Sequence, residues 1–258
     1  MVKKPLFPRR CAEDKARAAT GRRKPVVLPL LLSLAIVGSD VETATAKVPM
    51  DPNNPSCPKD LNWSTYRPMR FTYMEVEGLH ILKAEGVIDA DVASRLQAAI
   101  DEHKQIDEIW LRSPGGDARA GNEAGKLIRK LSLPTRIPSS WACFSACNFM
   151  FMGGPIRYVD GGGLFVVHMF THVGDKDAVQ AEVSKGADAT AQLIGDVEQD
   201  SAMLASEDND FLIKMGVSRK LLTEVMYKQK AVSAAADKST RRCLTESETG
   251  RYNVANAR

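Results

Sequence analysis

Three short segments carry residue types that together could cleave an acyl bond. Residues 113–116 read Ser-Pro-Gly-Gly, residues 143–147 read Cys-Phe-Ser-Ala-Cys, and His168 follows the apolar run 164–167. In this order they offer a glycine turn with free backbone N–H groups, a candidate nucleophile and a candidate base. Each segment alone is common, because Pro-Gly turns and serine helix caps have ordinary structural roles. Their order and spacing predict a serine hydrolase site.

Ser145 is the favoured nucleophile. It precedes the apolar segment 149–152, so we expect it at the start of a helix, where the N–H of Ala146 could donate to an oxyanion. Cys143 and Cys147 are alternative nucleophiles, but an exported cysteine enzyme is disfavoured where thiols oxidise. His172 is the reserve base, in the loop after the strand that ends at His168.

Alternating strand and helix patterns surround these segments. We expect strands at 79–83, 106–111, 135–138, 156–159 and 164–167, and helices around 92–100, 120–131 and 149–152. Strands that alternate with helices predict an α/β fold with a mostly parallel sheet. Residues 176–214 and 219–228 are expected to be helical, and the tail from about 231 is less regular. A histidine that ends a buried strand would face the sheet edge where α/β proteins bind ligands.

The first 46 residues differ from the rest of the chain. Nine Lys and Arg against four acidic residues accompany an uncharged apolar run at 26–37, and residues 44–46 read Ala-Thr-Ala. This pattern is typical of a secretory signal, and the run is shorter than the roughly 20 apolar residues of a membrane span. The sequence therefore predicts export to the periplasm, with retention of residues 1–46 as a membrane anchor as the alternative.

The remaining chain divides into a proline-rich, extended lead-in at 47–70 and an α/β domain at 71–258. The whole chain carries +3 and the leader +5 (9 − 4), so the rest is near −2, which gives no support for nucleic-acid binding. No Gly-x-x-x-x-Gly-Lys-Ser/Thr motif is present, so we expect no ATP site.

Four cysteines remain after the leader: Cys57, Cys143, Cys147 and Cys243. In an oxidising compartment they can pair in three ways, which the sequence does not distinguish. A zinc site is disfavoured because the Cys-x3-Cys pair has no second pair of ligands at suitable spacing. We expect no metal and no cofactor.

Residues 86–168 resemble the proteolytic subunit of the Clp protease and its relatives in the crotonase-like superfold, most specifically an exported branch with a Cys-x-Ser-Ala-Cys motif. The likeness rests on the glycine turn 113–116, the Ser-Ala step at 145–146 and the histidine that ends the strand 164–167. It implies a core of repeated ββα units. It also implies Ser145 as nucleophile, His168 as base, and the N–H groups of Gly116 and Ala146 as oxyanion hole.

The resemblance implies a third member, an acid, in a register that falls near Arg241 here. Because arginine cannot orient a base, Asp237 is the expected acid, with Asp175 and Asp177 as distant alternatives. Loss of the acid need not abolish catalysis, since it orients the base without taking its proton. Cys243 adjoins this segment, so we expect a disulfide from it to Cys143 or Cys147, which would hold the tail against the site.

The segment 176–214 corresponds to the helix by which the resembled family assembles into rings, so a homo-oligomer is an open expectation. The favoured function is an ATP-independent serine peptidase acting on a peptide or protein. A non-catalytic or regulatory module of the same fold is the alternative. Acyl-CoA chemistry and a Ser-Lys peptidase are less favoured, because export separates the chain from CoA and a Ser-Lys site would leave His168 unused.

Overall fold

The structure, a computed structural model, describes residues 49–103, 105–170, 176–232 and 236–257, which belong to one unit spanning 47–258. The predicted leader, as well as His172 and Asp175, lies outside the described residues. None of the helices in the described ranges is long and apolar enough to cross a membrane.

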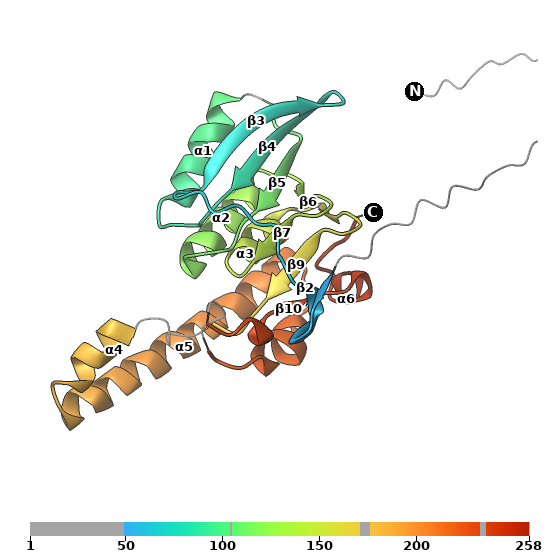
Figure 1. Cartoon of the computed structure of the whole chain (residues 1–258). Coiled ribbons are helices and arrows are strands. Elements are labelled where there is room, and N and C mark those ends of the chain that lie inside the picture. Colours follow the sequence, from blue (N-terminus) through green and yellow to red (C-terminus); the bar gives the residue numbers. More distant parts are fainter. Residues whose placement is uncertain (1–48, 104, 171–175, 233–235, 258) are drawn as a thin grey trace, which may run out of the picture. The chain divides into compact units, whose positions relative to one another are not determined.

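A five-stranded sheet carries the first half of the described chain (Figure 1). Its strands, in spatial order, are β3 (Arg70–Val76), β4 (Leu79–Glu85), β5 (Glu108–Arg112), β6 (Thr135–Ile137) and β8 (Arg157–Val159). The β3–β4 hairpin is antiparallel and every other neighbouring pair is parallel. The prediction of a mixed α/β fold with a mostly parallel sheet is confirmed.

A second, three-stranded sheet holds the strands nearest to the candidate site. β9 (Leu164–Val167) lies between β7 (Ala142–Phe144), to which it is parallel, and β10 (Arg242–Cys243), to which it is antiparallel. A single bridge between Ser113 and Cys143 connects β7 to the chain leaving β5. The segment that leads to the glycine turn and the segment that leads to Ser145 therefore lie side by side.

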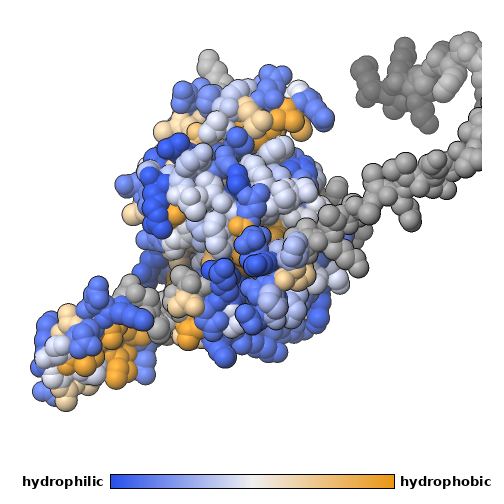
Figure 2. Space-filling model, viewed as in Figure 1, coloured by the Kyte–Doolittle hydropathy of each residue, from blue (hydrophilic) through white to orange (hydrophobic). Residues whose placement is uncertain are grey.

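Six α-helices are described: α1 (Val92–Glu102), α2 (Ala118–Lys130), α3 (Cys147–Gly153), α4 (Lys176–Val183), α5 (Ala187–Met215) and α6 (Glu246–Arg251). Residues predicted as one helix at 219–228 form a π-helical turn, η1 (Leu221–Val225), followed by a 3₁₀ turn, η2 (Met226–Lys228). A further 3₁₀ turn, η3 (Lys238–Thr240), precedes β10. The α4–α5 hairpin exposes apolar side chains (Figure 2), among them Val183, Ile194 and Met203.

The lead-in is more ordered than the sequence indicated. It contains β1 (Met50–Asp51) and β2 (Asn54–Pro58), which pair with each other. Cys57 is buried in a small cluster with Phe144, Val166 and Cys243. The lead-in therefore packs against the second sheet, an arrangement that its five prolines and few periodic apolar residues did not predict.

Helix α2 packs tightly on α3 because its facing positions are small. Asp117 caps α2 by accepting a hydrogen bond from the Ala120 N–H at 2.9 Å. A Cβ added at Gly121 would lie only 2.6 Å from the Ala146 carbonyl oxygen. The start of α3, and with it the turn that carries Ser145, is therefore held directly against α2.

Candidate active site

Ser145 occupies a sharp turn between a strand and a helix. It directly follows β7, lies two residues before α3, and has φ +58°. A non-glycine residue costs roughly 1–2 kcal/mol in this left-handed region, so the surrounding contacts must enforce the conformation. The turn is fixed by the Ser145 N–H, which donates to the Val166 carbonyl at 3.2 Å, and by the Asn148 N–H, which donates to the Ser145 carbonyl at 2.9 Å.

A disulfide between Cys143 and Cys147 spans this turn, with Cα atoms 5.4 Å apart. Both cysteines are fully buried. With both sulfur atoms in the disulfide, neither thiol is available as a nucleophile, which leaves Ser145 as the nucleophilic side chain of this segment. The expected disulfide from Cys243 to this pair is wrong, because the turn at Ser145 brings the two neighbouring cysteines together.

His168 reaches Ser145 because parallel strands end at the same edge. Phe144 of β7 is in register with Val166 of β9, so the residues that follow the two strands emerge side by side. Ser145 Oγ and His168 Nε2 are hydrogen-bonded at 2.6 Å. The structure thus brings together the two residues that the sequence singled out as nucleophile and base.

The glycine turn lies against Ser145. A Cβ at Gly115 would sit 2.6 Å from the Phe144 carbonyl oxygen and 2.7 Å from Ser145 Cβ, and its φ of +85° also favours glycine. The Gly115 N–H donates to Ser113 Oγ at 3.0 Å. Within the described ranges, no hydrogen bond uses the N–H of Gly116 or Ala146. These two donors flank the close contact between the turns.

The surroundings of the His168 ring favour its neutral form, which can accept a proton. Burial lowers its pKa from the ordinary 6.5, the backbone of Met169 partly opposes this, and the positive charge of Arg241 lowers the pKa further. A lowered pKa keeps the imidazole neutral near pH 7, as a general base requires. For Nε2 to accept from Ser145, the ring proton must be on Nδ1.

No acid orients that second nitrogen. His168 Nδ1 is buried and has no hydrogen-bond partner among the residues that the structure describes. Asp237 is half-buried and caps η3, where its carboxylate accepts from the Ser239 N–H at 2.9 Å and from the Ser239 hydroxyl at 2.6 Å. Contrary to expectation, Asp237 does not hydrogen-bond His168. The alternative Asp177 is exposed in the first turn of α4.

Arg241 packs on Phe144, whose ring contacts the ring of His168. The Phe144 ring packs on the His168 ring with centroids 4.8 Å apart, and the Arg241 guanidinium lies 5.6 Å from the Phe144 centroid and 5.1 Å from that of Trp63. Burial lowers the pKa of Arg241, and the negative charge of Asp51 partly opposes this effect. The sequence analysis identified Arg241 only as a residue that cannot serve as the acid. Its packing on Trp63 and Phe144 was not predicted.

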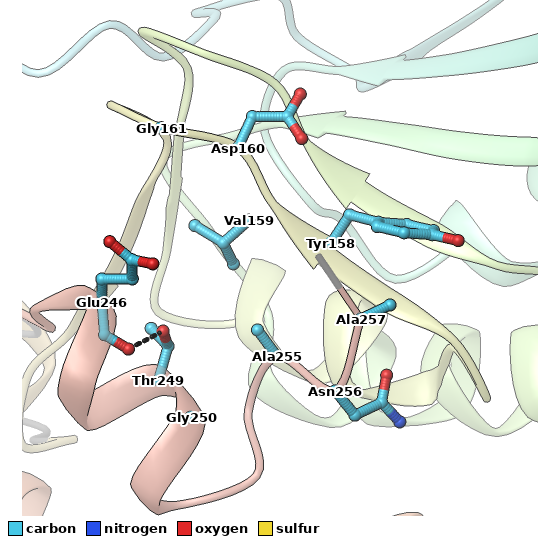
Figure 3. Close-up of a pocket in the computed structure, with 10 residues that line it drawn as sticks. All are labelled: Tyr158, Val159, Asp160, Gly161, Glu246, Thr249, Gly250, Ala255, Asn256 and Ala257. Carbon is cyan, nitrogen blue, oxygen red and sulfur yellow. Dashed lines mark hydrogen bonds between the residues drawn. The ribbon is translucent and has the colours of Figure 1, made fainter.

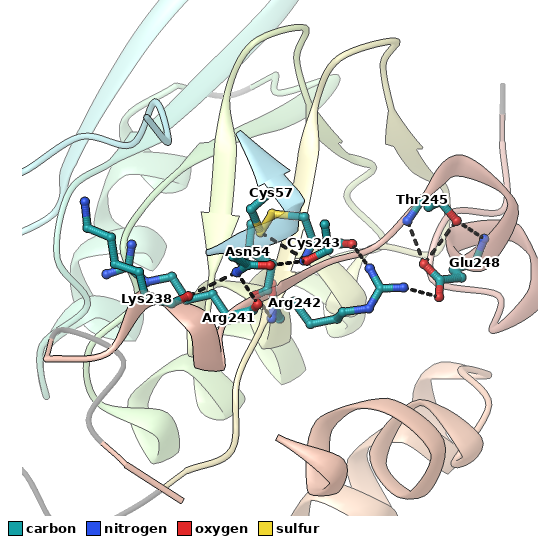
Figure 4. Close-up of a disulfide and its surroundings, with 11 residues drawn as sticks. Asn54, Cys57, Lys238, Arg241, Arg242, Cys243, Thr245 and Glu248 are labelled. Atoms are coloured by element: carbon teal, nitrogen blue, oxygen red, sulfur yellow. Dashed lines mark hydrogen bonds and ion pairs between the residues drawn. A yellow bond between two sulfur atoms is a disulfide. The ribbon is translucent and has the colours of Figure 1, made fainter. Parts of the chain in front are cut away.

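The segment that carries Arg241 is tied to the lead-in (Figure 4). Cys57 forms a disulfide with Cys243, and Asn54 Nδ2 donates to the carbonyl oxygens of Lys238, at 3.0 Å, and Arg241, at 2.5 Å. Lys238 and Arg241 are thereby positioned by residues almost 190 positions earlier in the chain. The two disulfides are consistent with an oxidising compartment.

A separate hollow lies between β8 and α6 (Figure 3). Its lining includes Tyr158, Asp160, Glu246 and Thr249, and contains neither Ser145 nor His168. No group of three or more potential His, Cys, Asp or Glu metal ligands occurs in the described part of the chain.

No family model matches this chain, and no curated protein matches it significantly. Among solved structures, a ClpP1 variant from Listeria monocytogenes is similar over 69% of this chain and 89% of its own, with 13% identity and a TM-score of 0.45. A variant of the 1510-N membrane-bound stomatin-specific protease is similar over 69% and 76%, with 13% identity and a TM-score of 0.42. Methylmalonyl CoA decarboxylase covers 34% and 44%, at 11% identity and a TM-score of 0.29. At these values the comparisons assign no activity.

Proposed function

We propose that this chain is an exported, ATP-independent serine hydrolase that cleaves peptide bonds. The observation that carries the proposal is the 2.6 Å hydrogen bond between Ser145 Oγ and His168 Nε2, made by a serine held at positive φ between a strand and a helix. A strained strand–turn–helix position exposes a serine hydroxyl for attack. The two disulfides support export.

Each residue has a definite role in the proposed reaction. His168 Nε2 takes the hydroxyl proton as Ser145 Oγ attacks the acyl carbon, and the N–H groups of Gly116 and Ala146 donate to the resulting oxyanion. His168 then gives the proton to the leaving amine, which leaves an acyl group on Ser145. Water, deprotonated by the same histidine, releases the acid product.

A second candidate is a non-catalytic module that retains the fold. His168 Nδ1 has no partner within the described ranges, which favours this candidate. An imidazolium formed during the reaction would then have no carboxylate of those residues to stabilise it, and Arg241 would oppose its charge. On the hydrolase proposal the same feature makes the enzyme slow, without removing its nucleophile, its base or its oxyanion donors.

A fluorophosphonate probe separates the two candidates, because an activated serine displaces its fluoride and forms a stable Oγ–P bond. We expect the oxidised wild-type protein to be labelled. Ser145→Ala should remove labelling, and His168→Ala should slow it by about 100-fold or more. Ser206→Ala, at an exposed position on α5, is the matched control and should be labelled like the wild type. A folded wild-type protein that does not react favours the non-catalytic module.

A further inference from the structure

One disulfide brackets the candidate nucleophile. Cys143 precedes Ser145 by two residues and Cys147 follows it by two, and the two sulfur atoms are bonded to each other. Cys143 belongs to β7, and Cys147 is the first residue of α3. The bond therefore connects a strand to the start of a helix, across the turn that presents the serine.

Both elements joined by this bond are fixed in the fold. Cys143 of β7 is in register with Phe165 of β9, the strand that ends next to His168. Helix α3 packs on α2, where a Cβ at Gly125 would lie 2.3 Å from the Phe149 carbonyl oxygen. Because a disulfide has a specific geometry and its two ends are held by these elements, it limits the conformations of the residues between them.

The start of α3 lacks a side-chain cap. Two backbone hydrogen bonds hold Ser145 at φ +58°, and the longer of them, from the Ser145 N–H to the Val166 carbonyl, measures 3.2 Å. Ala146, at the cap position of α3, makes no side-chain hydrogen bond to the first turn of the helix. A serine, threonine, aspartate or asparagine there would supply one. The covalent bond at Cys147 restrains the helix start in its place.

The lengths of the loops that the two disulfides close distinguish a local role from a global one. Cys143 and Cys147 are 4 positions apart in the sequence, whereas Cys57 and Cys243 are 186 apart. In the chain-entropy account, closing a short loop restricts the unfolded chain less than closing a long one. The Cys143–Cys147 bond therefore adds less to global stability, and its main consequence is the geometry of the turn that it spans.

The redox state of this pair is decided while the chain folds. Both cysteines are 0% exposed, so a thiol or disulfide in the solvent does not reach their sulfur atoms in the folded protein. A reducing compartment keeps cysteines as thiols, and an oxidising one favours disulfides. A chain that folded before export would hold Cys143 and Cys147 as thiols, and one that folds after export would hold them as a disulfide.

We propose that formation of the Cys143–Cys147 disulfide activates Ser145, which restricts the hydrolase activity to protein that has folded in an oxidising compartment. This inference rests on the proposed function and adds the regulation of its site. In the dithiol form, the turn is free to leave φ +58°, which moves Ser145 Oγ away from His168 Nε2, its hydrogen-bond partner at 2.6 Å. A displacement of about 1 Å is enough to slow such a reaction by about 100-fold.

The activating step is a thiol–disulfide exchange with a small-molecule or protein disulfide. One cysteine thiolate attacks this oxidant and forms a mixed disulfide, with release of one thiol. The thiolate of the second cysteine then attacks the sulfur of the first and releases the other thiol. The cysteine pair loses two electrons and two protons, and the oxidant gains them as two thiols.

The first test separates positioning from stability with two double variants. Cys143→Ala/Cys147→Ala should keep a melting temperature close to that of the wild type, and its fluorophosphonate labelling rate should fall by at least about tenfold. Cys57→Ala/Cys243→Ala is the matched control. It should lose more thermal stability because it opens the longer loop, and below its melting temperature it should label within about threefold of the wild type.

The second test leaves Cys143 and Cys147 unchanged. The Cys57→Ala/Cys243→Ala protein, in which those two cysteines are the only pair after the leader, is unfolded, reduced and refolded with either glutathione disulfide or reduced glutathione. Alkylation followed by mass spectrometry reports the state of the pair, and circular dichroism reports folding. We expect both forms to fold, and the disulfide form to be labelled at least about tenfold faster than the dithiol form.

The outcomes separate this inference from the function on which it rests. Equal labelling rates for the two forms, or a wild-type rate in folded Cys143→Ala/Cys147→Ala, would overturn regulation by this disulfide and leave the hydrolase proposal standing. Failure of both that variant and the dithiol form to fold would assign the bond to stability and overturn the inference likewise. If no form is labelled, the wild type included, the hydrolase proposal fails and the inference fails with it.

Discussion

The two sides of the His168 ring differ in how completely they are built. On the Nε2 side, the strand register, a disulfide and a close contact between two turns hold Ser145 within hydrogen-bond distance. On the Nδ1 side, the nitrogen is buried and has no hydrogen-bond partner among the residues that the structure describes. The groups that attack and accept a proton are thus arranged separately from the group that would orient and stabilise the base. We infer that Ser145 is positioned to react, whereas His168 Nδ1 lacks a hydrogen-bond partner among the described residues.

The largest expected effect on labelling comes from disturbing the Nε2 side of His168, where Ser145 is held in place. Gly115→Ala places a methyl group against the Phe144 carbonyl and Ser145 Cβ, both too rigid to yield, and does so at positive φ. The turn must shift and the oxyanion donors with it, so fluorophosphonate labelling should fall by about 100-fold. Gly195→Ala on α5, where a Cβ meets nothing within 4 Å, should label normally. Normal labelling of Gly115→Ala would show that this contact does not position the donors.

The next largest effect on labelling is expected from a variant that adds a carboxylate near His168. Arg241→Asp removes the positive charge near His168 and introduces a carboxylate at position 241. Its labelling rate should rise by about tenfold or more, since an acid that holds the base in the correct tautomer is worth far more in complete triads.

Arg241→Asn is the control, because it loses the same cation and the same stacking on Trp63 but supplies no carboxylate. Equal rates for the two variants would mean that residue 241 cannot reach Nδ1.

The smallest effect is on pH dependence. A base must be deprotonated to act, so the labelling rate should rise with pH and reach half its plateau below 6.5, because burial and the charge of Arg241 lower the pKa of His168. Arg241→Gln should move this midpoint to higher pH, because it removes the repulsion that disfavours the imidazolium. A midpoint that stays in place, or moves to lower pH, would show that Arg241 does not act on His168 electrostatically.

The elements that present the site were largely predictable because their signals are local. The apolar runs of β5 and β9 and the helical spacing in α2 placed the glycine turn and His168 correctly. The sequence analysis predicted no strand at β7. Its pairing depends on β9 and on the chain after β5.

The contacts that complete the site were less predictable because they are not local. The lead-in shows no periodic pattern, and its position depends on the disulfide from Cys57 to Cys243, 186 residues away. Asp237 was the acid nearest to Arg241 in the sequence, but its carboxylate accepts hydrogen bonds from Ser239.

The central claim is that Ser145 is activated by His168. Its most direct test is peptide mass spectrometry of the oxidised protein after fluorophosphonate treatment, folded and heat-denatured. We predict one adduct, on the peptide that contains Ser145, in the folded protein only, and its near absence in His168→Ala. An adduct on another residue, or equal modification of Ser145 with and without His168, would contradict the account.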